Sequence, residues 1–306
     1  MFFNFFATFH LLHSDDASPT GVSTPSISSL RTPSTTSTVE PLNAIILPSA
    51  LSHELSSLRR STITSTWGTS PLLKIHFLQS RADETAFDLL IRAYTYAIRL
   101  RSGLVFFCND HTFLIPSNLH SRFKALTSTG SRHVYEGRRL TGGHGEVFNS
   151  GAAGYFMSSE TVALVLSSCS PPSTKWLLNN PSPWLSSCLA EHGVRAAVNG
   201  GPEMYHMFPP GRVQTNDFDD WAYKKHPVDS VPISMGVPYE GTVDRASVSF
   251  HYISALECEL IWGCLVGRGG CEIKGERNEA KNGLMWYSKG GGEELLKWIR
   301  DGMEKV

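Results

Sequence analysis

Short apolar runs alternate with amphipathic segments through the first half of the chain. Ala44–Leu47, Leu72–Leu78 and Leu104–Phe107 are apolar runs of strand length, typical of strands buried on both faces of a parallel sheet. Between the last two runs, Glu84–Leu100 carries apolar residues at helical spacing, with Asp83 as its expected N-cap. Strand, helix and strand in this order predict an α/β fold with a mostly parallel central sheet flanked by helices.

Further elements follow from the same patterns. Ser49–Leu58 is predicted to be a helix, and Ser182–His192 is predicted to be another, because a proline stands near its start and a glycine follows its end. Val248–Ile253 alternates as a strand, which points His251 away from its immediate neighbours. Glu293–Met303 is predicted to be an amphipathic helix.

The ends of the chain differ in composition from its middle. Met1–Leu12 holds five phenylalanines but is shorter than the roughly 20 apolar residues that a membrane-spanning helix needs. Ser14–Glu40 is rich in Ser, Thr and Pro, which predicts a disordered stem. We therefore expect a stem over residues 1–40, a folded domain over 41–265, and a glycine-rich extension with a terminal helix over 266–306.

Charge and cysteine content exclude several classes of protein. A net charge of −1 gives no basic surface of the kind that nucleic-acid-binding proteins carry. None of the six cysteines forms a C-x-x-C pair, so a zinc ribbon or a thioredoxin-type site is not indicated. An even number of cysteines permits disulfides in an oxidising compartment without requiring them.

Polar residues follow directly on the third apolar run. Asn109, Asp110 and His111 stand at the expected carboxyl end of a buried strand, where open α/β sheets bind ligands. A carboxylate and an imidazole together suit Mn²⁺ better than Ca²⁺ or structural Zn²⁺. The alternative is a polar turn in which Asp110 caps the next element.

A second small-residue segment lies further along the chain. Gly151-Ala152-Ala153-Gly154 precedes Tyr155 and permits close approach of the backbone to a ligand or to another element. The alternative is a tight turn that binds nothing. Glu203–Pro210 is predicted to be a loop rich in aromatic and polar groups.

These segments, taken in order, carry a resemblance to a known family. The set consists of Thr66–Gly68 (T-W-G), Asn109–Phe113 (N-D-H-T-F), Asn149–Tyr155 (N-S-G-A-A-G-Y), Tyr205–Phe208 (Y-H-M-F) and Ser249–Tyr252 (S-F-H-Y). It resembles the fringe and core 1 β-1,3-galactosyltransferase family, and the match extends from about residue 45 to residue 258.

The resemblance implies a single Rossmann-like domain of the glycosyltransferase A-type fold. It also implies an inverting, Mn²⁺-dependent transferase that moves a hexose from a UDP-sugar to a glycan or glycoprotein. Galactose is the expected hexose, and β-1,3 is the expected linkage. The resemblance implies a protein of the Golgi membrane, with an N-terminal anchor and its folded domain in the lumen.

The resemblance also assigns residues to the site. Asp110, His111 and His251 would hold the metal, and Arg92, Asn109 and Asp110 would bind the nucleotide-sugar. Because the two histidines stand 140 residues apart in the sequence, we predict that the fold brings them together. The alternative for His251 is a hydrogen-bonded core histidine.

The remaining members of the implied site form the substrate pocket and the catalytic base. The pocket would be lined by Gly151, Ala152, Ala153, Gly154, Tyr155 and His206. Asn179–Pro183 stands where the family has an acidic pair, and it carries no carboxylate. Glu203 and Asp217 are therefore the candidate bases, and a degenerate transferase that only binds a nucleotide or glycan is the alternative function.

Overall fold

The computed structural model describes residues 40–49, 53–141, 147–196, 204–206, 246–251, 253 and 255–266. All of them belong to one compact unit of the chain, which begins at Val39. The predicted stem and the predicted helix Glu293–Met303 lie outside these residues. Within the described part, no helix has the length and apolar character needed to cross a bilayer.

A five-stranded sheet forms the centre of the domain, in the order β2-β1-β3-β8-β5. The strands are β1 (Leu42–Leu47), β2 (Leu73–Phe77), β3 (Leu104–Asn109), β5 (Tyr135–Gly137) and β8 (Tyr155–Ser158). β1 pairs in parallel with both β2 and β3, whereas β8 runs antiparallel to its neighbours β3 and β5. β8 is therefore the one strand of this sheet that runs against the others, and the prediction of a mostly parallel sheet is confirmed.

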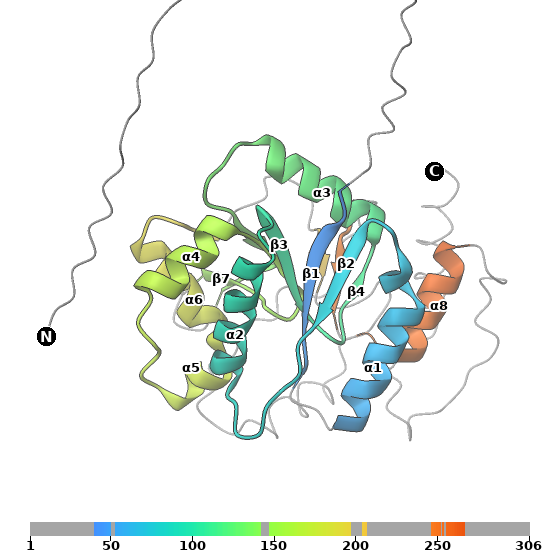
Figure 1. The fold of residues 1–306 in the computed structure, drawn as a ribbon, viewed down its shortest axis with the longest axis horizontal. Helices are drawn as coiled ribbons and strands as arrows, with labels where there is room; N and C mark the ends of the chain where they lie inside the picture. The colour runs from blue at the N-terminus through green and yellow to red at the C-terminus, as the bar shows by residue number, and fades with distance from the viewer. Residues whose placement is uncertain are drawn as a thin grey trace, which may run out of the picture. The chain divides into compact units, whose positions relative to one another are not determined.

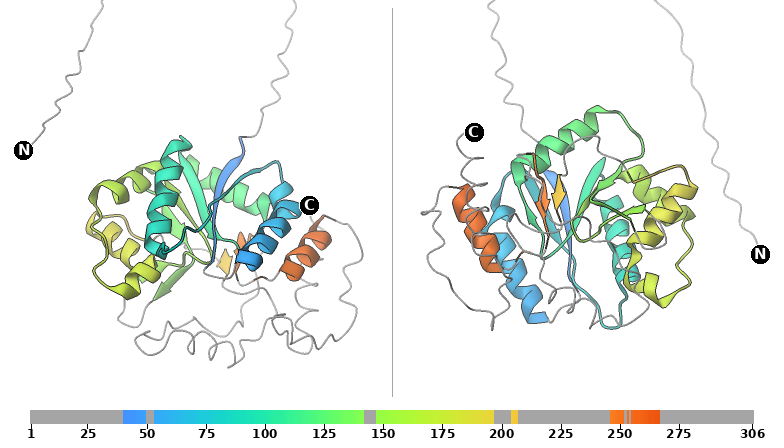
Figure 2. Two further views of the ribbon diagram at one scale, coloured as in Figure 1. Left: turned by 60° about the horizontal axis from the view of Figure 1, so that its bottom comes forward. Right: turned by 180° about the vertical axis from the view of Figure 1, so that it is seen from behind.

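Helices flank this sheet on both sides (Figure 1). They are α1 (His53–Ser65), α2 (Ala86–Arg99), α3 (Pro116–Ser128), α4 (Ser159–Ser168), α5 (Lys175–Asn179), α6 (Pro181–Glu191) and α8 (Ala255–Leu265), with a short 3-10 turn at Trp67–Thr69. In all views α1 and α8 lie side by side, while α2, α4 and α6 cover the other face of the sheet (Figure 2).

The alternation of side chains along the central strands divides the core in two. Phe106 and Cys108 of β3 belong to one buried cluster, which also contains Trp67 and residues of α3 and α8. Val105 and Phe107 point to the opposite face and pack with residues of α2, α4 and α6. A strand buried on both faces carries consecutive apolar residues, which is why the apolar run at the start of β3 predicted its place.

Two small sheets accompany the central sheet among the described residues. β4 (Phe113–Leu114), β10 (Ser249–Phe250) and β9 (Tyr205–His206) form one of them, in the order β4-β10-β9. β6 (Arg139–Thr141) and β7 (Val147–Asn149) form the other. β10 pairs antiparallel with β4, so the chain near residue 250 is brought to the end of β3.

The ends of two predicted helices are corrected by the structure. α2 begins at Ala86, and its N-cap is Thr85, whose side chain accepts a hydrogen bond from the Asp88 amide in a capping box. The prediction of Asp83 as N-cap is therefore wrong, since Asp83 lies earlier, in the left-handed region at φ 59°. The helix predicted over Ser49–Leu58 is α1, which starts later, at His53.

One disulfide joins two helices on the α2 side of the sheet. Cys169, at the C-cap of α4, is bonded to Cys188 of α6, and their Cα atoms are 5.8 Å apart. Cys108 is a buried free thiol, and Cys258 is also buried. Disulfides persist in oxidising compartments, so this bond is typical of a secreted or lumenal protein.

Candidate functional site

The predicted site turn lies where the parallel strands β1 and β3 end. Leu47 and Asn109 are the last paired residues of the two strands. The Asp110 amide donates to the Leu47 carbonyl at 3.0 Å, which extends the ladder by one bond. The Thr112 amide then donates to the Asn109 carbonyl at 3.2 Å, which closes the turn before β4.

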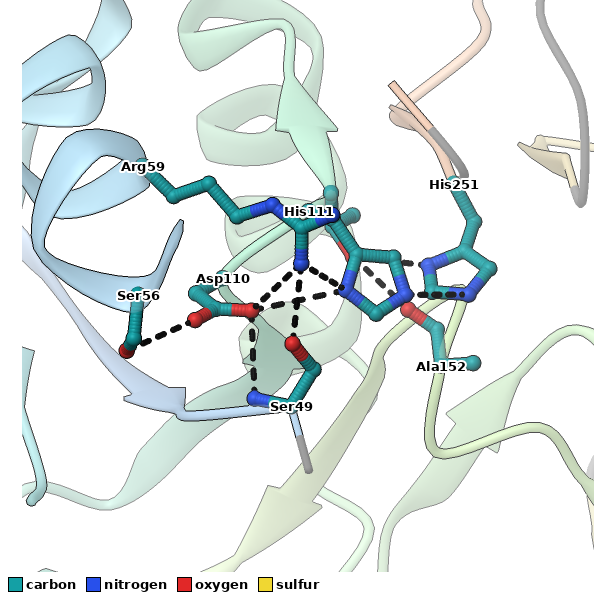
Figure 3. A network of polar contacts seen from close by, with 8 residues as sticks. Ser49, Ser56, Arg59, Asp110, His111, Ala152 and His251 are labelled. Carbon is teal, nitrogen blue, oxygen red and sulfur yellow. Dashed lines mark hydrogen bonds and ion pairs between the residues drawn. The ribbon is translucent and has the colours of Figure 1, made fainter. Parts of the chain in front are cut away.

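The Asp110 carboxylate is buried and surrounded by donors (Figure 3). Its Oδ1 accepts a hydrogen bond from the Ser49 amide at 3.1 Å and lies 3.4 Å from Arg59 Nη1. Its Oδ2 accepts from the Ser56 hydroxyl at 3.1 Å. These donors come from the end of β1 and from α1, and none belongs to α3, so Asp110 does not cap the next helix.

The charges at this turn favour an ionised carboxylate and a neutral imidazole. Burial opposes the ionisation of Asp110, but the neighbouring His111, the Ser49 amide and the charge of Arg59 outweigh it, so the pKa of Asp110 is lowered. Burial lowers the pKa of His111, against the effect of Asp110, and therefore favours its neutral form. Burial also lowers the pKa of Arg59, but a guanidinium keeps its charge at any physiological pH.

His111 and His251 meet at this turn although they are far apart in the sequence. Their Nε2 atoms are 3.0 Å apart, and their ring centroids are 4.1 Å apart. The Ile253 amide donates to the His111 carbonyl at 3.1 Å, which fixes the segment after β10 against the turn. The structure thus brings together Asp110, His111 and His251 as the sequence predicted.

The hydrogen bonds around these histidines indicate where their protons lie. The Thr112 hydroxyl donates to the Ala152 carbonyl at 2.7 Å, so at 3.2 Å it accepts from His251 Nδ1. The Nε2 atoms of the two histidines face each other, and one of them carries the proton between the rings. Arg59 Nη1 lies 3.1 Å from His111 Nδ1, on the side of the ring that also faces Asp110.

Asp110, His111 and His251 do not surround one point in this structure. Asp110 approaches the Nδ1 side of His111, at 3.4 Å, while His251 lies on the Nε2 side, so the side chains form a row instead of enclosing a point (Figure 3). Among the residues that the structure describes, no group of three or more His, Cys, Asp or Glu side chains is arranged to hold a metal ion. The guanidinium of Arg59 also lies against both Asp110 and His111, where it would repel a divalent cation.

Other predicted donor-binding residues lie apart from this network. Arg92 donates from Nε and Nη2 to the two oxygens of Glu84, each at 2.7 Å, and also to the Gln79 carbonyl. Among described residues, Arg92 makes no contact with Asp110. Asn109 is half-buried at the end of β3, directly before the Asp110 turn.

The predicted pocket segment divides between the site and its surroundings. The Ala152 carbonyl accepts from Thr112 and so adjoins the histidine pair. The Gly151 amide donates to the Ser182 hydroxyl at 3.3 Å. Ser182 belongs to the segment that the resemblance aligns with the missing acidic pair, so that segment reaches the site through Gly151.

The later residues of the segment are part of the core. Ala153 and Tyr155 are buried, and the Tyr155 hydroxyl is hydrogen-bonded to the Tyr94 hydroxyl at 2.7 Å. Gly154, at φ 90°, packs against Phe106. His206 pairs through its backbone with Phe250, while Glu203 and Asp217 lie outside the described residues.

The sequence predictions missed Ser49, Ser56, Arg59 and Thr112. Ser49 follows the carboxyl end of β1, so the rule that pointed to Asp110 applies to it equally. Ser56 and Arg59 are three residues apart on one face of α1 and therefore reach the same neighbour. No comparable signal in the sequence singled out Thr112, whose role depends on the paths of three separate segments.

Comparison with known proteins agrees with the motifs. No protein-family model matches the chain. Over 176 residues the chain is 26% identical to a protein from Xenopus laevis named glycoprotein-N-acetylgalactosamine 3-beta-galactosyltransferase 1. The match covers 54% of this chain and 46% of the relative, so it spans about half of each protein. This similarity agrees with the resemblance of the motifs to core 1 β-1,3-galactosyltransferases, and the α/β architecture is consistent with the glycosyltransferase A-type fold.

Proposed function

We propose that the protein is a glycosyltransferase that moves a hexose from a UDP-sugar to a glycan or glycoprotein in β-1,3 linkage. Galactose is the hexose that we propose. The observation that carries this proposal is the meeting of Asp110, His111 and His251 at the carboxyl end of β3. These residues belong to two separate motifs of the resemblance. The similarity to a relative named as a galactosyltransferase supports the same conclusion.

The described residues suit the binding part of this task. The turn after β3 lies where α/β sheets bind nucleotides, and a guanidinium there suits the charge of a diphosphate. The resemblance also implies Mn²⁺, which would neutralise charge on the leaving UDP. Because the side chains lie in a row, we assign no step to the metal, and the assay below measures its effect directly.

The disulfide supports a location in the secretory pathway. Cys169 and Cys188 are bonded, and such bonds form in the endoplasmic reticulum and persist beyond it. A lumenal domain in the Golgi, which the resemblance implies, meets this condition. Localisation of the tagged full chain by microscopy, with and without residues 1–40, tests both the compartment and the proposed anchor.

The direct test is a transfer assay. The full chain is incubated with a panel of UDP-sugars and with a glycopeptide that carries N-acetylgalactosamine, with Mn²⁺ and with EDTA. We expect transfer of galactose, detected by mass spectrometry and linkage analysis. Asp110→Asn should lower the rate by about 100-fold, because the turn loses its charge.

Asp83→Asn is the matched control for that variant. It makes the same chemical change at an exposed residue in the left-handed region, which asparagine tolerates. Its rate should equal that of the unmodified protein. If no sugar is transferred and UDP does not bind to the folded protein, the proposal is wrong.

A second function, binding without efficient turnover, is favoured by one observation. The segment that includes Asn180 and Ser182 contacts Gly151 of the site but offers no carboxylate to act as a base. A general base contributes about 10²–10⁴-fold to a rate. A slow enzyme that still binds UDP would therefore result from its loss.

Restoring a carboxylate separates the two functions. Asn180 is the N-cap residue of α6, and its side chain makes no capping hydrogen bond, so Asn180→Asp removes no such bond and should leave the fold intact. A higher rate at unchanged UDP affinity supports the binding function. Strong turnover of the original protein, undiminished in a Glu203→Ala and Asp217→Ala double variant, contradicts both the lost base and the proposed substitutes.

A further inference from the structure

The site turn contains one carboxylate, and the guanidinium of Arg59 from α1 lies against it. Asn109 is neutral, so Asp110 supplies the only formal negative charge of the Asn109–Thr112 turn. Both of its oxygens already have donors, namely Ser49 and Arg59 at Oδ1 and Ser56 at Oδ2. A divalent metal ion would have to approach a carboxylate that is only 4% exposed and that lies 3.4 Å from the Arg59 cation.

Arg59 is held in place from several sides. Its Nη1 donates to the Ser49 hydroxyl at 2.8 Å and lies 3.4 Å from Asp110 Oδ1 and 3.1 Å from His111 Nδ1. Every hydrogen bond that Arg59 makes with described residues uses this one nitrogen. The Nε and Nη2 groups of the planar fork make no hydrogen bond with described residues, and the side chain is 18% exposed.

This geometry is that of an anchored anion receptor. A guanidinium binds phosphate through two parallel N–H groups, and Asp110 with Ser49 fixes the orientation of the fork. Holding the cation in advance lowers the entropy cost of binding. Two of the residues that the resemblance assigns to a metal ion, Asp110 and His111, thus lie against Arg59.

We propose that the Arg59 guanidinium takes the place of a divalent metal ion and binds the diphosphate of the donor directly. This inference rests on the proposed function, because it presupposes a nucleoside-diphosphate ligand. Asp110 and His111 are positioning residues in this arrangement. Donor binding is then independent of metal.

The test is calorimetric titration of the full chain with UDP, in EDTA and in Mn²⁺. We expect binding in EDTA, with a dissociation constant within about threefold of the value in Mn²⁺. Arg59→Ala should weaken UDP binding in EDTA by about tenfold or more, as expected for the loss of charge-assisted hydrogen bonds. Arg59→Lys should recover part of the affinity, since a lysine keeps the charge but lacks the fork.

Arg99→Ala is the matched control. Arg99 is an exposed residue in the last turn of α2. It lies just before the start of β3, whereas the Asp110 turn follows the carboxyl end of that strand. Its loss makes the same change in net charge and should leave UDP affinity unchanged. Thermal melting of each variant verifies that it is folded.

A second titration, with Mn²⁺ alone, measures the competition between the two cations. If Arg59 excludes the metal, Arg59→Ala should bind Mn²⁺ more tightly than the original protein, because Asp110, His111 and His251 lose their positive neighbour. A merely structural role of Arg59 predicts no such gain. Equal or weaker Mn²⁺ binding by the variant overturns the exclusion.

The outcomes distinguish this inference from the proposed function. UDP binding that occurs only with Mn²⁺ overturns the role of Arg59 and leaves the transferase proposal standing. Absence of UDP binding under both conditions overturns both. The comparison of EDTA with Mn²⁺ uses the original protein, so it decides the question without relying on the folding of any variant.

Discussion

The turn Asn109–Thr112 and the segment Gly151–Tyr155 were both predicted to line the site, yet the structure uses them differently. The turn carries polar side chains into a network with Ser49 and Arg59. The segment touches that network at Ala152 and then enters the core, where Tyr155 packs against Phe107 at 5.5 Å between ring centroids. Glycines permit close approach of any neighbour, and here the neighbour of Gly154 is the Phe106 side chain.

The largest effect that follows from this comparison concerns the two glycines of the segment. Gly154 has φ 90°, and an added Cβ would overlap the Phe106 ring. Gly154→Ala should therefore lower the free energy of unfolding by about 3 kcal/mol or more, because backbone strain and overpacking add. Chemical denaturation followed by circular dichroism measures this change.

Gly151→Ala is the control within the same segment. Its φ is not positive, and its added Cβ would lie 3.1 Å from the Ser182 hydroxyl, which can rotate. We expect a loss below about 1 kcal/mol. Equal losses at the two positions would show that the segment behaves as a single unit.

A smaller effect is expected for the buried tyrosine pair. Tyr155→Phe removes the partner of the Tyr94 hydroxyl at 2.7 Å, and leaving a buried hydroxyl unpaired costs about 1–2 kcal/mol. Adding Tyr94→Phe removes the orphaned group, so the double variant should be no less stable than the single one. If the double variant loses as much free energy of unfolding as the two single variants together, the two hydroxyls act independently. UDP affinity should stay unchanged in all three variants.

The smallest effect is a pH dependence outside both regions. Burial and the nearby Lys74 lower the pKa of His76, whose ring nitrogens contact Tyr96 and Asn43. In the unfolded chain the pKa of His76 is about 6.5. At pH values above this, the neutral His76 side chain makes its full contribution to the stability of the folded protein. As the pH falls, the unfolded chain takes up a proton that the folded protein resists, so the free energy of unfolding decreases until the folded pKa is passed.

His76→Gln should remove this component. Denaturation at pH 7.5 and at pH 5.5 should show a smaller difference for the variant than for the original protein. An unchanged difference would locate the pH dependence at other groups, and the Asp110 turn would be the first to examine.

Much of the fold was predictable because it depends on local patterns. The apolar runs predicted β1, β2 and β3, and helical spacing predicted α2. The end of α1 and the N-cap of α2 were not predictable to the residue. For α2, Thr85 and Asp83 are both acceptable N-cap residues, and the capping box between Thr85 and Asp88 selects Thr85.

The site was predictable only in part, for a physical reason. Asp110 and His111 stand at a strand end, which the pattern reveals, and His251 came from the resemblance. Arg59 reaches the turn because α1 is held against the sheet by Ile63, which belongs to the buried cluster that contains Ala44 and Ile46 of β1. No spacing in the sequence states which helix face meets which strand end. Arg92 was assigned to the donor, but Glu84 already holds its guanidinium.

The disulfide has a practical consequence for the production of this protein. Cys169 and Cys188 are 19 residues apart, and the loop between them contains α5 and the residues that reach Gly151 through Ser182. Closing a loop of this size stabilises a protein by about 3 kcal/mol. Expression in a reducing bacterial cytosol would omit this tether and loosen the segment that contacts Gly151. An inactive preparation from such a host would then reflect the redox state of its thiols, and export to the periplasm or expression in a secretory host would be needed before activity is judged.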